Sequence, residues 1–243
     1  MQKRAQAGSA FQPIDVKIDL AIARPLASWL KVAIDGRLTT QSGVIDTMDS
    51  AGAPVSQLLF TNALVTEVGL PEVGGGLSVV DGAIDIQLDP ETTTYQRATA
   101  PAGTASANNP QRTLPTAFLF SVEGVTWGAG IHLKPLIWKA SADLGTSGGS
   151  RTYAKPFTQP TVVATFAASA GSPWKSWITS GAAAKSGTLQ YVTASGQPLA
   201  TVNLIGLVPT RVAPSAMNAG ASQTIQTDEV TMSVQRAEIV LPP

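Results

Sequence analysis

The sequence contains no cysteine and only one histidine, His132. A chain without cysteine forms no disulfides and no thiolate metal sites, and a single imidazole would leave any metal to carboxylates alone. No stretch approaches 18 consecutive apolar residues, so we expect no membrane-spanning helix and no membrane insertion. Residues 1–13 begin with basic residues but lack the apolar run of a secretory signal, and we interpret them as an arm. We expect no cofactor and no metal.

Charge is also scarce. Charged residues make up 13% of the 243, with 16 basic and 16 acidic side chains, against about 25% in an average globular protein. A chain with zero net charge offers no basic field for neutralising phosphates, which argues against nucleic-acid binding. A shortage of surface charge favours a protein that hides surface against neighbouring subunits. A Ser/Thr-rich secreted β domain is the alternative.

What the sequence does contain is a series of short apolar segments separated by glycine and proline, which is typical of a mainly β protein. Residues 14–22 alternate between apolar and polar side chains, as a half-buried strand does. Residues 29–34, which end in Asp35-Gly36, also read as a strand, and residues 117–122 followed by Glu123-Gly124 echo them. Further strands are predicted near residues 57–69, 79–89, 131–138, 161–166, 188–192 and 199–205.

One short helix is predicted from Pro173 to Gly181. Proline suits the first position of a helix and glycine its end. Trp174, Trp177 and Ile178 follow the i, i+3, i+4 spacing and therefore share one face. Because two turns of helix are not stable alone in water, we expect this face to dock on a sheet.

The strongest organisational signal is an internal repeat between residues 60–91 and residues 204–238. In one register three residues match at a separation of 143: Leu64 with Leu207, Val65 with Val208, and Pro71 with Pro214. Three positions further along, a second alternating apolar row matches: Ile84 with Val230, Ile86 with Met232, and Leu88 with Val234. We interpret the chain as two divergent copies of one β unit.

The two copies differ in length. Residues 98–113 have the composition of a linker, which places one unit, with its arm, at residues 1–97 and the other at residues 114–243. The acid-glycine turns and the repeat segments are much closer together in the first unit than in the second. We therefore expect an abbreviated first unit, missing a central block, before a complete β-barrel or β-sandwich unit with one short flanking helix.

Candidate catalytic residues are few, and we predict that the protein is not an enzyme. His132 lies in an apparent strand, and no nucleophile-elbow pattern supports a Ser-His-Asp site around it. The carboxylate pairs Asp85 with Asp89 and Asp228 with Glu229 are interpreted as strand-end and surface charges. Among hydrolases, only one using His132 stays open as a hypothesis.

Two further features suggest ligand binding only weakly. The three glycines at 74–76 lie between strands without a following helix, so a phosphate-binding loop is not expected. Trp127 and Trp138 suit a sugar site, but core packing or a subunit contact is the simpler interpretation. A secreted β-sandwich that binds carbohydrate or protein stays as the alternative function.

With these residues laid out, the chain resembles the tail-tube family of contractile phages and related contractile injection systems. The resemblance is best in residues 186–239, where a strand, a glycine turn and a second strand lead into Leu207-Val208-Pro209-Thr210, a small-residue loop and an alternating last strand. The helix bearing Trp174 and Trp177 stands where such proteins place a short tryptophan-bearing helix. Residues 58–91 look like the corresponding part of larger tube-like proteins with two such units.

The resemblance implies a β-barrel with a flanking helix whose copies close into rings around a channel. The rings would be hexameric, or trimeric with pseudo-sixfold symmetry, and would meet sheath, baseplate or other tail proteins while DNA or protein cargo passes through. It also implies a place in a virion tail or injection particle after synthesis in the bacterial cytoplasm. Two departures, the abbreviated first unit and the length of the chain, leave tube, hub and tube-end adaptor roles open. The candidate packing and assembly residues are Trp174, Trp177, Ile178, Leu207, Pro209, Leu64 and Pro71.

Overall fold

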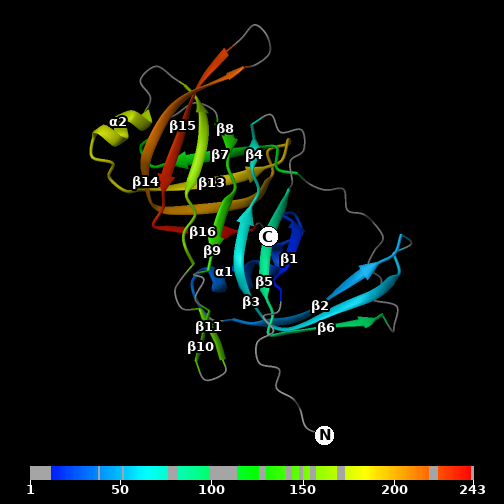
Figure 1. Cartoon of the computed structure of the whole chain (residues 1–243). Coiled ribbons are helices and arrows are strands. Elements are labelled where there is room, and N and C mark those ends of the chain that lie inside the picture. Colours follow the sequence, from blue (N-terminus) through cyan, green and yellow to red (C-terminus); the bar gives the residue numbers. More distant parts are fainter. Residues whose placement is uncertain are drawn as a thin grey trace.

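The computed structural model describes residues 12–37, 39–50, 52–75, 82–98, 114–125, 130–140, 144–147, 150–153, 157–168, 173–218 and 224–241. The protein is mainly β, with two short α-helices in these residues (Figure 1). The arm predicted at residues 1–13 and the linker predicted at 98–113 lie almost wholly outside them. No helix in the described ranges is both long and apolar enough to cross a bilayer.

The first half of the chain forms one sheet around a long strand, β3 (Pro54–Leu70). The amino-terminal part of β3 pairs with β2 (Gln41–Met48) and β6 (Thr92–Arg97), and its carboxy-terminal part pairs with β5 (Ala83–Asp89). The outer strand, β1 (Ile14–Asp19), adds to β5. After β1, a 3-10 turn at Arg24–Leu26 leads into α1 (Ala27–Ile34), and β4 (Val73–Gly74) continues the path of β3.

The prediction of a strand at residues 29–34 was wrong, because this segment is the helix α1. Val32 and Ile34 favour a strand by propensity, but Pro25 in the preceding turn starts a helical path. Leu30, Ala33 and Ile34 then form a buried i, i+3, i+4 face. The proposed echo between residues 29–36 and 117–124 therefore fails, since a helix is matched with the strand β7 (Ala117–Val122).

The second half builds a sheet that curves into a nearly closed barrel, in the order β4-β8-β12-β15-β14-β13-β7. Around this barrel β16 pairs with β14, while α2 carries Trp174 and Trp177. The elements not yet given bounds are β8 (Gly130–Leu133), β9 (Leu136–Lys139), β10 (Leu144–Ser147), β11 (Ser150–Tyr153), β12 (Val162–Ala167), α2 (Pro173–Thr179), β13 (Lys185–Val192), β14 (Pro198–Asn218), β15 (Thr224–Ser233) and β16 (Arg236–Val240).

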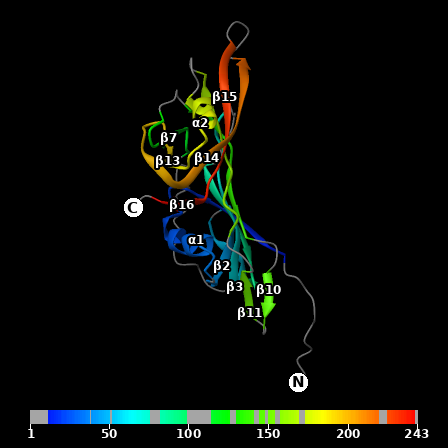
Figure 2. The ribbon, with the colours of Figure 1, turned by 90° about the vertical axis from the view of Figure 1, so that its left-hand side faces the viewer.

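Two hairpins project at opposite ends of the molecule. The β14–β15 hairpin extends beyond the barrel at one end, and the β10–β11 pair lies at the other end, beyond α1 (Figures 1 and 2). The core of the second repeat includes an aromatic cluster that joins α2 to the barrel, with Phe166 in contact with Trp174 at a centroid distance of 4.9 Å and with Phe120 at 5.9 Å. This packing confirms the prediction of a β-barrel with a flanking helix.

The two halves repeat the same pairing scheme. Each half contains a hairpin with the same sequence of residue pairs. One pair is followed by a bulge, five consecutive pairs, a second bulge and a last pair whose second member is proline. Every residue number rises by 144 between the β2–β3 and the β13–β14 hairpins: Gln41↔Ala63, Gly43↔Phe60 and Met48↔Pro54 become Lys185↔Leu207, Gly187↔Leu204 and Val192↔Pro198. A shared register with two shared bulges identifies these hairpins as equivalent.

The other strands of the repeat follow. All five pairs of β3 with β5, including the bulge after Val65, recur 144 residues later between β14 and β15. The β14–β16 pairs likewise match five β3–β6 pairs. The strand β1 corresponds to β12, since Ile14↔Leu88 becomes Val162↔Met232 and the five following pairs agree as well.

This register corrects two predictions. The separation of the matched strands is 144, so Val65 is equivalent to Pro209 and not to Val208, and Ile86 is equivalent to Val230 and not to Met232. Of the central block that the first unit was predicted to lack, β12 and α2 do have counterparts, β1 and α1, so the prediction was wrong for these two elements and right for β8 to β11. In the described residues, the first repeat lacks counterparts of β7 to β11. The boundary placed at residues 98–113 stays a prediction, and strands on its two sides are hydrogen-bonded to one another.

Candidate functional site at the junction of the two repeats

The two repeats are joined by one bridging strand, made of β8 and β9 with Lys134-Pro135 between them. On one side this strand runs antiparallel to β3 and β4 in a single register, from Glu67↔Lys139 to Gly74↔His132. On its other side, β8 pairs with β12 of the second repeat. The β3 edge of the first repeat is thereby connected to the β12 edge of the second.

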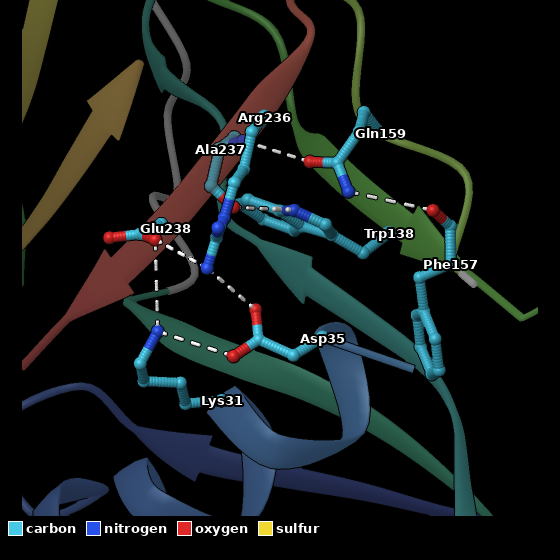
Figure 3. A network of polar contacts seen from close by, with 8 residues as sticks. All are labelled: Lys31, Asp35, Trp138, Phe157, Gln159, Arg236, Ala237 and Glu238. Atoms are coloured by element: carbon cyan, nitrogen blue, oxygen red, sulfur yellow. Dashed lines mark hydrogen bonds and ion pairs between the residues drawn. The ribbon is translucent and has the colours of Figure 1, made fainter. Parts of the chain in front are cut away.

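Trp138 anchors the bridging strand in the core of the junction (Figure 3). Its side chain is fully buried, and its indole N–H donates to the carbonyl of Ala237 in β16 at 3.3 Å. The N–H of Ala237 in turn donates to Oε1 of Gln159 at 2.8 Å, and the Gln159 amide donates to the carbonyl of Phe157. Every polar group in this chain of contacts has a partner, as burial requires.

Next to Trp138, and below it in the view of Figure 3, four charged side chains connect α1 of the first repeat to β16 of the second. Arg236 bridges Asp35 at 3.1 Å and Glu238 at 2.7 Å, while Lys31 lies 3.4 Å from Asp35 and 3.8 Å from Glu238. Asp35 is the residue that caps the carboxy-terminal end of α1. After it, Gly36 adopts a positive φ of 74° and turns the chain away from the helix axis. Arg236 is half exposed, so this network fixes orientation more than it adds stability.

The solvent face of the joined sheet carries paired charges. Lys17 lies 3.4 Å from Asp85, and Lys139 lies 3.0 Å from Glu67. A groove on this face is lined by Lys17, Glu67 and Asp85 together with glycine and proline residues. A surface of closely spaced opposite charges has little net field, so a passing polyion is neither strongly attracted nor strongly repelled.

Farther along the same face, the bridging strand contacts both repeats through polar side chains. His132 contacts the carboxylate of Glu72, and Lys134 lies 3.0 Å from Glu229 of β15. The lone histidine is thus placed in a junction contact with one carboxylate. The described residues hold no group of three or more potential metal-ligand side chains.

Counting the bridging strand once, the joined sheet has seven strands in the order β1-β5-β3-β9/β8-β12-β15-β14. All pairs are antiparallel, so the two outer strands, β1 and β14, run in the same direction. Their outer edges are the counterparts of the two edges that the bridging strand joins. The edge of β14 at residues 211–214 corresponds to β3 at 67–70, and β1 corresponds to β12.

The candidate residues named from the sequence lie in the cores of the two repeats. Trp174 and Trp177 are buried and Ile178 is half-buried, and the indole N–H of Trp177 donates to the carbonyl of Ala183 at 2.8 Å. The buried members on or next to the long strands are Leu64, Pro71, Leu207 and Pro209. Their side chains pack within the chain, so any effect on assembly would act through the shape of the repeat.

The junction residues Lys31, Asp35, Arg236 and Glu238 were not predicted from the sequence. Asp35 and Arg236 are 201 residues apart, and no local pattern indicates that the end of a helix contacts so distant a strand. Core packing, the preferred interpretation of Trp138, is confirmed because the side chain is fully buried, and the alternative of a sugar-lining residue is wrong. Trp127, the other candidate, lies outside the described residues.

Comparisons with known proteins give structural similarity only. No family model and no curated protein sequence matches the chain. A chain of the sixfold-symmetrised anti-feeding prophage (AFP) baseplate has 12% identity and a TM-score of 0.38, over 59% of this chain and 97% of that one. A chain of the PVC sheath-tube complex, an extracellular contractile injection system in the extended state, has 15% identity and a TM-score of 0.43, over 58% and 100%. Hcp1 from Flavobacterium johnsoniae has 9% identity and a TM-score of 0.39, over 52% and 96%.

Proposed function

We propose that this protein is a structural subunit of a tail-like tube or hub, whose copies associate head to tail into a ring around a channel. The observation that carries the proposal is the junction inside the chain. There, two equivalent β units already meet through different edges, β3 of one and β12 of the other, and not through the same edge twice. A contact between different surfaces, repeated by rotation, produces a closed ring or an open filament.

In the described part of the chain, such an arrangement leaves the two outer edges of the seven-stranded sheet unpaired: that of β1 in the first repeat and that of β14, at residues 211–214, in the second. Unpaired strand edges are a liability for a soluble protein, and ring closure removes them. Since each chain carries two repeats, three copies supply six units. This supports the trimer of pseudo-sixfold symmetry, one of the two ring types that the sequence resemblance implies, and favours a hub or tube-end role over a plain tube subunit.

The solvent face of the seven-stranded sheet suits the wall of a channel. Its paired charges, such as Lys17 with Asp85, favour passage of DNA or protein cargo without sequence-specific binding. We infer a non-enzymatic role in a virion tail or injection particle, in contact with sheath, baseplate or other tail proteins. The proposal needs no cofactor.

The test is native mass spectrometry of the purified full-length chain over a wide concentration range. We expect a discrete trimer, with no ladder of undefined sizes, because a closed ring has a fixed number of subunits. A protein that stays strictly monomeric at high concentration would refute the proposed function. A hexamer would support the formation of a ring but would contradict the trimer of pseudo-sixfold symmetry.

A further inference from the structure

We propose that the outer edge of β2, together with the apolar face of the β2–β3–β6 sheet, binds one extended strand donated by a partner protein. The large apolar residues of this face are Ile45, Leu58, Phe60 and Tyr95. The bound strand would run antiparallel to β2 and carry bulky apolar side chains at alternate positions. This inference goes beyond the contact between copies of the chain, and it rests on the register of the two repeats.

The four side chains share one face because of how the strands are paired. Ile45 of β2 pairs with Leu58 of β3, and Leu58 pairs with Tyr95 of β6 on its other side. Residues directly opposite each other in antiparallel strands point to the same side of the sheet. Phe60 stands two residues after Leu58 and therefore points to that side as well.

The opposite face of the same sheet is polar. There the amide of Gln57 donates to Asp46 at 2.8 Å, and the amide of Gln96 donates to Gln57 at 3.0 Å. Each of these three residues follows directly after a residue of the apolar face in the sequence. An antiparallel sheet with one polar and one apolar face normally buries the apolar one.

In the second repeat the equivalent face is buried. The counterparts of Ile45, Leu58 and Phe60, 144 residues later and each at most 1% exposed, are Leu189, Val202 and Leu204. In the first repeat the same three positions are only half-buried. Tyr95, at the far side of the face, is 77% exposed. The first repeat therefore keeps the apolar face but leaves it open.

The strand β7 completes this face in the second repeat. It pairs antiparallel with β13, along the edge that corresponds to the outer edge of β2. Phe120 lies directly opposite Leu189, and Phe118 and Val122 point to the same side and pack in the core. In the described residues of the first repeat, β7 has no counterpart and β2 has no strand on its outer edge.

One donated strand suits both features that the first repeat leaves open. Its backbone would pair with the edge of β2, and its alternate side chains would pack beside the apolar face, as in other cases of strand addition. The β7 register, moved back by 144 residues, puts one such side chain opposite Ile45 and the next opposite Thr47. Neither of these β2 positions carries a charge, so apolar residues suit the donated strand.

The donor is expected to be another protein. Figure 1 shows β2 and β6 projecting away from the barrel, whose own strands therefore do not supply the missing one. The two longest segments outside the described ranges, residues 1–11 and 99–113, contain no run of alternating large apolar residues. A second copy has the same strands, already paired within its own sheets.

Binding of a synthetic peptide tests the proposal. The probe is a fluorescently labelled peptide with the sequence of residues 116–123, TAFLFSVE, because β7 occupies the equivalent edge. Fluorescence anisotropy with the full-length chain should show saturable binding. A control peptide with serine in place of Phe118 and Phe120 should bind at least about tenfold more weakly, because its inward side chains are no longer apolar. Absence of saturable binding, which is also expected if another segment of the chain already fills the site, would overturn the proposal.

Two substitutions on β2 locate the bound peptide. Thr47→Asp puts a charge at an exposed position on the apolar side and should weaken binding by about tenfold or more. Val44→Asp, at a residue 52% exposed on the opposite face, is the matched control and should leave the affinity unchanged. Hydrogen exchange of the β2 amides should slow when the peptide binds. Equal affinity of both variants, or a change in exchange confined to β13, would mean that the peptide displaces β7 and would overturn the proposal.

The same variant separates this inference from the proposed function. Thr47→Asp should form the same ring as the native chain, because β2 is not an outer strand of the seven-stranded sheet. Loss of the ring in this variant would assign the surface to the contact between copies and overturn the donated strand. Peptide binding by a chain that stays strictly monomeric would support this inference and refute the proposed function.

Discussion

Thr66 and Thr210 make the same hydrogen bond in the two repeats. Each is the extra residue of a bulge in a long strand, and each hydroxyl donates to a carbonyl across the sheet, Thr66 to Gln87 at 3.2 Å and Thr210 to Thr231 at 3.1 Å. Bulges bend a strand and increase its twist. The shared bulge therefore allows the long strand of each repeat, β3 or β14, to pair within two sheet segments that are oriented differently.

Replacing these threonines tests whether the two bulges are equivalent. Thr66→Val and Thr210→Val remove the hydroxyl and keep the β-branched shape, so each should lower the free energy of unfolding by about 1 kcal/mol. Thr210 is more exposed than Thr66, so its loss should be the smaller. Urea unfolding of both variants provides the comparison, with Thr188→Val, an exposed threonine on β13, as the control. No change in either bulge variant would mean that these bonds do not hold the bulges.

Trp177→Ala should destabilise the second repeat strongly. The side chain is buried, stacks on Trp174 at 6.3 Å and donates to Ala183. Truncation of a large aromatic in a core costs about 3–5 kcal/mol. Denaturant unfolding should show this loss, and Trp29→Ala, at the half-buried counterpart, should show a clearly smaller one. An unchanged unfolding midpoint for Trp177→Ala would mean that α2 is not docked on the barrel.

Tyr191→Phe should stabilise the protein. The Tyr191 hydroxyl is buried and has no hydrogen-bond partner in the described part of the chain, and burial raises the pKa of this phenol far above its usual value. A buried hydroxyl without a partner costs about 1–3 kcal/mol, so its removal should raise the unfolding free energy by about 1 kcal/mol. Thermal and urea unfolding measure the change. A loss of stability would reveal a partner outside the described residues.

A double-mutant cycle on Asp35 and Arg236 measures the coupling between the repeats. Asp35→Ala, Arg236→Ala and the double variant should give a coupling energy of about 0.5–1 kcal/mol, because Arg236 is half exposed. The coupling should shrink in high salt. The exposed pair Lys17 and Asp85 within the first repeat is the control, with a similar or smaller value. Coupling that does not change with salt would contradict an ionic origin.

The fold was predictable from sequence to the extent that local patterns determined it. The alternation of residues 14–22 gave β1, and the spacing of Trp174 and Trp177 gave α2. The repeat was found, but in the wrong register, because Ala63, Leu64 and Val65 are all buried and hide the alternation that fixes a strand's face. The identities at separation 144, Ser42-Gly43 with Ser186-Gly187 and Pro54 with Pro198, mark the bulge and the turn and would have corrected it.

The junction was less predictable. The helix α1 was missed because Val32 and Ile34 favour a strand by intrinsic propensity. The helical conformation is stabilised by the packing of its apolar face, which local sequence does not reveal. The bridging strand appeared in the sequence as one strand near residues 131–138, but nothing local shows that its two sides serve different repeats. Partners separated by many residues are set by tertiary structure, and the contact of Asp35 with Arg236 is of that kind.

The most direct test of the central claim is an electron-microscopy reconstruction of the purified, assembled protein. We predict three chains around a central hole, arranged as six similar units, with the strand face that carries Lys17, Glu67 and Asp85 turned toward the hole. A particle without a hole, or one in which that face points away from the axis, would contradict the account.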